Sequence, residues 1–126
     1  MSVKVLVVED NDMNMQLVEY LLEEAGFEIV KATSGESALE VLRRTSSPDL
    51  ILLDIHLPGM DGLSVARELR QDRRTMTIPI VALTAHAMRG DRDHLLEAGC
   101  DGYISKPIDV RTFIETISSY IPEETS

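Results

Sequence analysis

The chain has little of what marks several classes of protein. Its one cysteine, Cys100, can form no internal disulfide and offers no pair of thiolates to a metal ion. No apolar run approaches the roughly 20 residues that cross a membrane, and the N-terminal sequence MSVKVLVVED turns acidic where a signal peptide needs a longer apolar stretch. We therefore expect a cytoplasmic protein in which Cys100 is a small packing residue.

Positive charge is also scarce. Lysine and arginine number 12 against 22 aspartates and glutamates, so the formal net charge is −10 at pH 7. Direct binding to nucleic acid or to an anionic membrane needs a basic surface. The composition therefore argues against both kinds of binding and favours protein partners. We expect the chain itself to be a monomer or a weak dimer.

Apolar residues are plentiful enough for one sizeable core. The 126 residues are 44% hydrophobic, which suffices for a single domain without disulfides or a structural metal. We place this domain at residues 1–122 and a polar C-terminal tail at residues 123–126. Five short apolar runs predict buried strands, at residues 3–8, 28–32, 50–53, 80–83 and 102–105.

Segments with helical spacing separate and follow these runs, and glycine and proline fall at the joints. The predicted fold is α/β, a (βα)5 chain whose doubly wound, five-stranded parallel sheet is covered by helices on both faces. Apolar residues recur on one helix face in four sets: Leu17, Val18, Leu21, Leu22 and Ala25; Ala38, Leu39 and Leu42; Ala66 and Leu69; and Val110, Phe113, Ile114, Ile117 and Ile121.

Acidic residues follow two of the predicted strands. Glu9 and Asp10 come after residues 3–8, and Asp54 comes after residues 50–53. Each acid by itself is commonly a helix cap or a solvated strand end. Parallel strands, however, bring their carboxyl ends to one sheet edge, where three carboxylates repel each other unless a cation such as Mg²⁺ neutralises them. The cluster is consistent with a metal-assisted hydrolase or with a carboxylate that itself accepts a phosphoryl group.

A hydroxyl and an amine are predicted at the same edge. Thr84 follows residues 80–83, and Lys106 follows residues 102–105. Singly, such a threonine is often just a strand former and such a lysine often serves solubility. Together they can donate to phosphoryl oxygens beside Asp54. We also predict a cis bond between Lys106 and Pro107, since a tight turn there directs the amine back to the site.

Ordered motifs across nearly the whole chain resemble the receiver domain of two-component response regulators. They are VLVVEDN, LILLDIHLPGMDG, IVALTA and YISKP. Within that family, NDMNMQLV, TAHAMRGD and EAGCDGYISKPI are most similar to single-domain cell-cycle regulators and to receivers of hybrid histidine kinases. The resemblance implies a flavodoxin-like fold with strand order 2-1-3-4-5.

The resemblance also implies roles for the acidic residues. Asp54 matches the phosphoacceptor, which takes a phosphoryl group from a phosphohistidine on a histidine kinase or histidine phosphotransfer protein. Asp10 matches a direct ligand of Mg²⁺, Glu9 a neighbour that acts mainly through water, and the backbone carbonyl of His56 the third protein ligand. Glu9 replaces an aspartate that is frequent at this place in the family, and the same replacement is seen in the branch that resembles hybrid kinases.

The same resemblance implies a switch. Lys106 and Thr84 match the phosphoryl contacts, and Tyr103 matches an aromatic residue whose ring moves inward when Thr84 is drawn toward the phosphate. A phosphate adds about two negative charges, and contacts made only in the phosphorylated state shift a two-state element. We expect the helix from about Met88 to Ala98 to move, because its sequence has few apolar anchors. A downstream protein would then bind this helix, the strand around Tyr103 and the last helix.

Two histidines stand two positions after the site residues, His56 after Asp54 and His86 after Thr84. Two imidazoles on separate loops are a weak signal for zinc. In the family, side chains at these places flank the path of the attacking water. We therefore hypothesise that the pair tunes dephosphorylation and makes it sensitive to pH near neutrality, since histidine titrates at about 6.5.

Three functions stay open. The leading one is a single-domain signalling switch, not an enzyme apart from slow autodephosphorylation. A phosphatase of the aspartyl-phosphate type shares the acids and the lysine, but it needs a substrate pocket and a further general acid that we do not find in the sequence. The third is a receiver domain of a hybrid histidine kinase that acts as a phosphorelay station. The start at Met1 and the polar tail favour the first function over the third.

Overall fold

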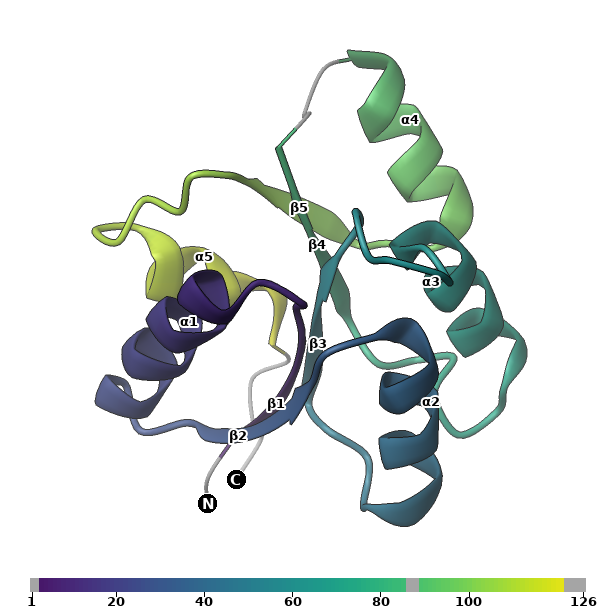
Figure 1. Cartoon of the computed structure of the whole chain (residues 1–126), viewed down its shortest axis with the longest axis horizontal. Coiled ribbons are helices and arrows are strands. Elements are labelled where there is room, and N and C mark those ends of the chain that lie inside the picture. The colour runs from purple at the N-terminus through teal and green to yellow at the C-terminus, as the bar shows by residue number, and fades with distance from the viewer. Residues whose placement is uncertain (1–2, 86–88, 122–126) are drawn as a thin grey trace.

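Strands and helices alternate along the chain in the computed structural model, which describes residues 3–85 and 89–121 (Figure 1). The elements are β1 (Lys4–Val8), α1 (Asp12–Glu24), β2 (Glu28–Ala32), α2 (Gly35–Arg44), β3 (Leu50–Asp54), α3 (Gly62–Gln71), β4 (Ile80–Thr84), α4 (Arg89–Ala98), β5 (Gly102–Ser105) and α5 (Phe113–Tyr120). The predicted α/β alternation is confirmed.

The sheet has five parallel strands in the order β2-β1-β3-β4-β5. This is the flavodoxin-like order that the resemblance implied. In the central pair, Val8 lies opposite Leu53. The carboxyl ends of β1 and β3 therefore reach the same level of the sheet. The acidic residues predicted at the sheet edge lie at these two strand ends.

Helices cover both faces of the sheet. Helices α1 and α5 lie on one face, and α2, α3 and α4 lie on the other (Figure 1). Every residue of β3 and β4 is buried because both faces of these central strands are covered. Each fully buried leucine or isoleucine of these strands contributes about 1.5–3 kcal/mol through the hydrophobic effect. The two strands therefore form a rigid support for the side chains at their ends.

Polar residues begin three of the helices. The side chain of Asn11 accepts a hydrogen bond from the N–H of Asn14 in the first turn of α1, over 3.0 Å. Ser34 and Ser37 form a capping box at the start of α2, and Asp61 caps α3 by accepting from the Ser64 N–H. These caps satisfy N–H groups that have no partner within the helix, and they fix where α1 and α3 leave the sheet edge.

Several predicted boundaries need correction. Asp54 and Thr84 are the last residues of β3 and β4 and do not follow them, because the ladder continues through the pairs Asp54–Leu83 and Thr84–Ser105. Val3 lies outside β1. Backbone pairing extends the two central strands by one polar residue each, which an apolar pattern cannot reveal.

Two residues assigned to buried helix faces are not buried. Ala25 is the exposed C-cap of α1, and Val110 precedes α5 and is 53% exposed. Correct spacing does not extend a helix past its cap, and α5 begins only at Phe113. Met88 and the tail at residues 123–126 lie outside the described residues, and the domain limit at residue 122 stays a prediction.

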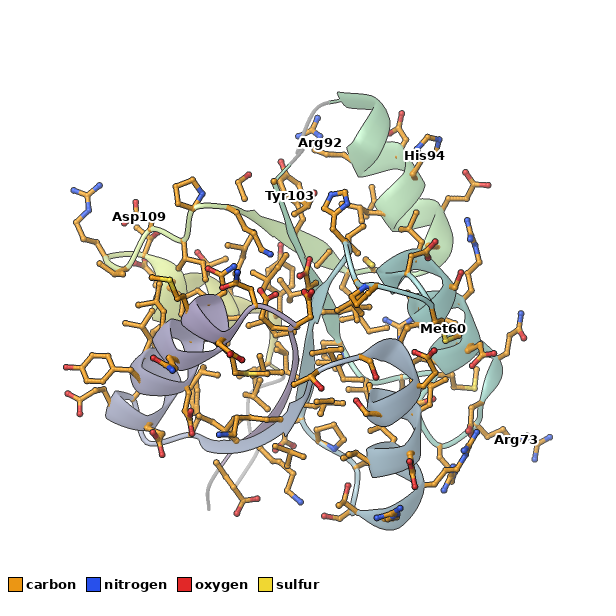
Figure 2. All side chains as sticks on the ribbon, viewed as in Figure 1. Met60, Arg73, Arg92, His94, Tyr103 and Asp109 are labelled. Atoms are coloured by element: carbon orange, nitrogen blue, oxygen red, sulfur yellow. The ribbon has the colours of Figure 1, made fainter. Side chains whose placement is uncertain are left out.

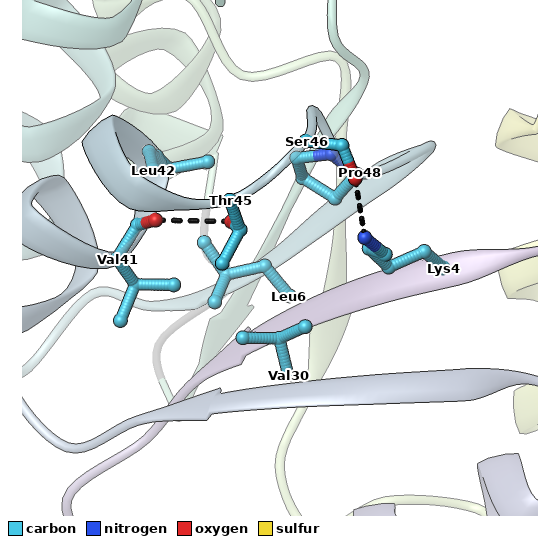
Figure 3. A pocket seen from close by; sticks show the side chains of 8 residues that line it. All are labelled: Lys4, Leu6, Val30, Val41, Leu42, Thr45, Ser46 and Pro48. Carbon is cyan, nitrogen blue, oxygen red and sulfur yellow. Dashed lines mark hydrogen bonds between the residues drawn. The ribbon is translucent and has the colours of Figure 1, made fainter.

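The opposite end of the sheet carries a shallow apolar hollow between the start of β1 and the end of α2 (Figure 3). Lys4 Nζ donates a hydrogen bond to Ser46 Oγ across its rim, over 2.6 Å. Among the residues described, no helix has the length and apolar character to span a membrane.

Candidate functional site

The sheet register brings the polar strand ends together. Glu9 follows Val8 in β1, and Asp54 follows the residue opposite Val8 in β3, so the two acids leave the sheet side by side. Thr84 ends the next strand, β4, and its carbonyl accepts a hydrogen bond from the Lys106 N–H over 2.8 Å. The predicted cis bond between Lys106 and Pro107 is present.

Lys106 lies between the two buried acids. Its Nζ atom is 3.2 Å from Glu9 Oε1 and 3.2 Å from Asp54 Oδ2. Glu9 and Asp54 are only 1% and 2% exposed. Two carboxylates facing a single ammonium in a buried place leave one negative charge without compensation, which is costly in an apolar environment. The site therefore favours a bound proton or a second cation.

The pKa values reflect this crowding. Burial raises the pKa of Glu9 from its ordinary 4.5 to about 7, and its hydrogen bond with Asp54 and the negative charge of Asp54 act in the same direction. Burial also acts to raise the pKa of Asp54, but hydrogen bonds from Glu9 and the His56 N–H and the charge of Lys106 outweigh it, so the pKa of Asp54 falls below its ordinary value. Without a metal, Glu9 is therefore the acid of the pair that takes up a proton first as the pH falls, whereas Asp54 stays ionised.

The acids fit a hard divalent cation. One oxygen from each of Glu9, Asp10 and Asp54 lies within 4.8 Å of the others. Among the residues that the structure describes, none donates a hydrogen bond to the buried Glu9 Oε1. Lys106 is close enough for an ion pair with it but lacks hydrogen-bond geometry. Asp10 is exposed at the rim, which leaves one side of the cluster open to solvent. Mg²⁺ prefers such a set, with carboxylate ligands on one side and water or phosphate on the other.

The loop after β3 holds Asp54 in place from the backbone. The His56 N–H donates to Asp54 Oδ1 over 3.0 Å. Gly62, the first residue of α3, donates its N–H to the Ile55 carbonyl over 3.1 Å. A Cβ atom at Gly62 would lie 2.5 Å from the Asp54 carbonyl oxygen, so only glycine permits this approach. A glycine at this joint between predicted elements was expected, but this close approach was not, although the position of Gly62 right after the cap Asp61 was a usable signal.

The two predicted switch residues lie in different surroundings. Thr84 is buried at the end of β4, near the acids, whereas Tyr103 on β5 is half-buried and packs against the core on the α4 side. Arg92 of α4 donates to the Tyr103 hydroxyl over 3.3 Å, and its guanidinium carbon lies 6.0 Å from the centre of the ring (Figure 2). The tyrosine thus connects β5 to α4.

The histidines are placed unevenly. His56 is exposed in the loop directly after Asp54. His86 lies outside the described residues, so the hypothesis that the two histidines act together stays a prediction. Within the described chain, the acids and Lys106 come together as the sequence predicted.

Comparison with known proteins decides the family. Residues 5–118 match the response regulator receiver domain. The chain belongs to this family. Receiver domains are signalling phosphoacceptors and not enzymes in the usual sense, and they interact with histidine kinases or phosphotransfer proteins and with downstream targets. This assignment disfavours the phosphatase.

Individual receivers resemble the chain over nearly its whole length. The polar-differentiation response regulator DivK of Brucella ovis is 48% identical over 121 residues, which are 96% of this chain and 98% of the relative. The expected likeness to a single-domain regulator of this family is confirmed.

Solved receiver structures share the fold. The chemotaxis protein CheY4 of Vibrio cholerae superposes with a TM-score of 0.91 at 26% identity, covering 96% of this chain and 100% of its own. The receiver domain of a sensor histidine kinase from Pseudomonas aeruginosa superposes with a TM-score of 0.86 at 33% identity, covering 95% of this chain and 98% of its own. That structure has a magnesium ion coordinated in its active-site cleft.

Proposed function

We propose that this receiver accepts a phosphoryl group on Asp54 from a phosphohistidine of a histidine kinase or phosphotransfer protein in the cytoplasm. The observation that carries the proposal is the buried Asp54 carboxylate, ionised, with the Lys106 ammonium 3.2 Å from its Oδ2 atom. A buried, ionised carboxylate beside a cation and an acidic cluster has the features of an activated nucleophile for phosphoryl transfer.

In the transfer, the nitrogen–phosphorus bond of the donor breaks and a bond forms between phosphorus and a carboxylate oxygen of Asp54. The lowered pKa keeps Asp54 ionised for this attack, and the His56 N–H holds the carboxylate in one orientation. Glu9, Asp10, Asp54 and the His56 carbonyl would hold Mg²⁺, which reduces the repulsion between the carboxylates and the incoming phosphoryl group.

The new phosphate would be sensed by Lys106 and Thr84. It adds about two negative charges where the unmodified site has a carboxylate, so the ammonium and the hydroxyl gain contacts that exist only in the phosphorylated form. Movement of Thr84 would open space for the ring of Tyr103, which shifts the contact between Tyr103 and Arg92 and with it α4.

A downstream protein would bind the face formed by α4, β5 and α5. A hollow there is lined by residues of all three elements, among them Leu96, Tyr103 and Tyr120. Leu96 is 59% exposed. An apolar side chain beside a movable helix supports a surface whose shape depends on phosphorylation.

Incubation with acetyl phosphate and Mg²⁺, followed by intact-mass measurement, tests the function. We expect a single phosphoryl adduct that is absent from Asp54→Asn and present in the control Asp93→Asn, which alters an exposed acid of α4. An adduct on Asp54→Asn, or many turnovers of phosphodonor without any adduct, would contradict the proposal.

The role of the histidines needs a separate measurement. We propose that His56 and His86 tune the lifetime of the phosphorylated form, because His56 is exposed in the loop next to Asp54. Dephosphorylation of the wild type and of the His56→Ala, His86→Ala double variant is compared between about pH 5.5 and 8, across the histidine pKa of about 6.5. Identical pH profiles would remove the idea.

A relay function is the second candidate, favoured by the 33% identity to the receiver of a sensor histidine kinase. A relay station passes its phosphate back to a histidine, whereas a switch keeps it and binds a target. Radiolabelled phosphate that moves rapidly from the phosphorylated chain to a phosphotransfer protein would favour the relay.

A further inference from the structure

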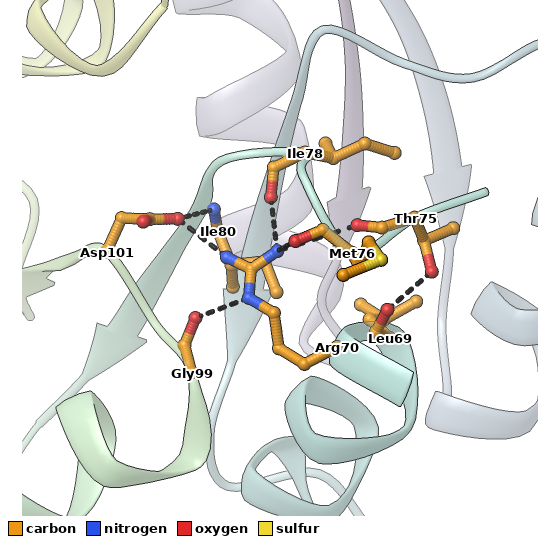
Figure 4. A network of polar contacts seen from close by, with 8 residues as sticks. All are labelled: Leu69, Arg70, Thr75, Met76, Ile78, Ile80, Gly99 and Asp101. Carbon is orange, nitrogen blue, oxygen red and sulfur yellow. Dashed lines mark hydrogen bonds and ion pairs between the residues drawn. The ribbon is translucent and has the colours of Figure 1, made fainter. Parts of the chain in front are cut away.

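Arg70, in the last turn of α3, makes a hydrogen-bond network at the end of the sheet opposite to the acids (Figure 4). Its guanidinium donates to the carbonyls of Met76 and Ile78, over 2.9 and 2.8 Å, in the connection to β4. It also donates to the Gly99 carbonyl over 2.8 Å and to Asp101 Oδ2 over 2.7 Å, in the connection between α4 and β5. One side chain thus joins the end of α3 and the connection that follows it to the connection between α4 and β5, about 30 residues further along the chain.

Asp101 extends this network into the sheet. Its Oδ2 atom accepts from the Arg70 guanidinium and also from the N–H of Ile80, the first residue of β4, over 2.7 Å. The Asp101 N–H donates to the Ile80 carbonyl over 2.8 Å. Hydrogen bonds to charged groups in planar, multidentate arrangements are among the strong ones in proteins. The start of β5 is therefore held to β4 and α3 together.

The backbone conformation of Gly99 and the lack of a side chain there allow this arrangement. Its φ angle is +108°, and a Cβ atom at this position would lie 2.5 Å from Arg70 Cγ. A side chain at Gly99 would therefore strain the backbone and also displace the arginine.

The described side chains of α4, at residues 92–98, differ in how they are held. Among its described side chains, the buried ones are Leu95 and Ala98, both in the half next to Gly99. Toward the other end, Arg92 is exposed and reaches Tyr103 through a polar contact. The apolar packing and the Arg70 network thus hold the same end of α4.

We propose that Arg70 is a positioning residue that anchors the C-terminal end of α4 and the start of β5, so that phosphorylation moves α4 about this end. The proposal rests on the proposed function, because it states which part of the switch stays still. It assigns to Arg70 no contact with the phosphate. Without the anchor, the change at Tyr103 spreads into the connection between α4 and β5.

Hydrogen exchange tests the anchor in the unphosphorylated protein. The N–H groups of Gly99, Cys100 and Asp101 are hydrogen-bonded and should exchange slowly. Arg70→Met should speed their exchange about tenfold or more, while the amides of β3 change far less. Arg73→Met is the matched control, since Arg73 is exposed nearby and extends away from the fold (Figure 2). Equal exchange at these three amides in both variants would overturn the proposal.

Amide chemical shifts with and without beryllium fluoride and Mg²⁺ test the switching role, since beryllium fluoride mimics a phosphoryl group on an aspartate. In the wild type we expect shifts at Asp54, Tyr103 and Arg92 and almost none at Gly99 and Asp101. In Arg70→Met the shifts should extend to Gly99 and Asp101. Large shifts at these two residues in the wild type would also overturn the proposal.

Two further outcomes separate possible failures. If beryllium fluoride shifts nothing around Asp54 in the wild type, the proposed function fails, while the exchange experiment still tests the anchor. If Arg70→Met does not fold, Arg70→Lys replaces it. A lysine can keep the ion pair with Asp101 but cannot reach all the carbonyls. The exchange rates of the three amides should then lie between those of the wild type and those expected when every Arg70 contact is lost. Rates equal to the wild type with Arg70→Lys would contradict a role for the planar guanidinium.

Discussion

At the scale of single residues, the site is governed by the ratio of two buried carboxylates to one ammonium. Lys106 stabilises the ionised Asp54, and Glu9 binds a proton more tightly than an ordinary glutamate because a second buried negative charge is costly. Burying a pair of like charges is costly, and removing the one partner of opposite sign leaves that cost uncompensated. The free energy of unfolding should therefore depend on the charge state of the site.

Removal of Lys106 should destabilise the fold when Mg²⁺ is absent. For Lys106→Met at about pH 8 we expect a loss of about 3–5 kcal/mol in the free energy of unfolding, because the two buried carboxylates lose the one cation that the described residues place beside them. Urea titration with a chelator measures this, and Mg²⁺ should restore part of the loss. The control Lys31→Met removes an exposed ion pair with Glu19 and should cost less than about 1 kcal/mol. A loss equal to the control would contradict this account.

Glu9 should make stability depend on pH. Its pKa is raised from 4.5 to about 7, so the folded chain binds this proton more tightly than the unfolded chain does. The resulting stabilisation is complete below about pH 4.5 and is lost as the pH rises through about 7. Relative to Glu9→Gln, the wild type should lose on the order of 2 kcal/mol between about pH 4.5 and 8 without Mg²⁺. Parallel curves for the two proteins in urea titrations over this range would refute the assignment.

At the scale of elements, the loop between β3 and α3 depends on how closely α3 approaches the strand. The N-terminus of α3 meets the backbone of Asp54 and Ile55 at Gly62, with no space for a Cβ atom. The contacting atoms belong to the backbone and cannot turn aside as a flexible side chain can. The helix therefore determines the path of the chain just after Asp54.

Gly62→Ala tests this close approach. The added methyl group must displace α3 or the loop, so we expect a loss of about 1–3 kcal/mol in the free energy of unfolding. Phosphorylation by acetyl phosphate should also slow, because the His56 N–H that orients Asp54 lies in the same loop. Arg67→Ala, an exposed change on the same helix, should stay within about 0.5 kcal/mol of the wild type. If Gly62→Ala leaves the free energy of unfolding and the phosphorylation rate unchanged, the loop accommodates the methyl group and the prediction is wrong.

At the scale of the whole molecule, a net charge of −10 and a local acidic cluster act together. Any ion that binds the folded state and not the unfolded state stabilises the fold by mass action. A divalent cation at the site should therefore stabilise the whole chain, beyond what screening of its general negative charge provides.

Magnesium should raise the unfolding temperature in a site-specific way. With Mg²⁺ about tenfold above its dissociation constant we expect a gain of about 1.4 kcal/mol, seen as a higher Tm in thermal unfolding. NaCl at equal ionic strength controls for screening, and Asp10→Asn should lose most of the gain, since it removes a carboxylate of the cluster. The same gain in Asp10→Asn and in the wild type would place the bound ion elsewhere.

Much of this architecture could be predicted from the sequence. Apolar runs of strand length predicted the five strands, and two of them, Glu28–Ala32 and Gly102–Ser105, have the predicted bounds. The acids, Thr84 and Lys106 were assigned to one edge because parallel strands share the direction of their carboxyl ends. The errors at Ala25 and Val110 lie at helix ends, where capping and not spacing decides the boundary.

By itself, the sequence determined which residues are buried in strands and which polar groups follow them, because alternation of apolar runs and helical patterns leaves few ways to form a core. Only the tertiary structure decided that Lys106 lies between Glu9 and Asp54, and that Arg70 joins α3 to the connection between α4 and β5. These contacts join residues far apart in the chain. They depend on the register of neighbouring strands and on the paths of loops, which local patterns of hydrophobicity do not encode.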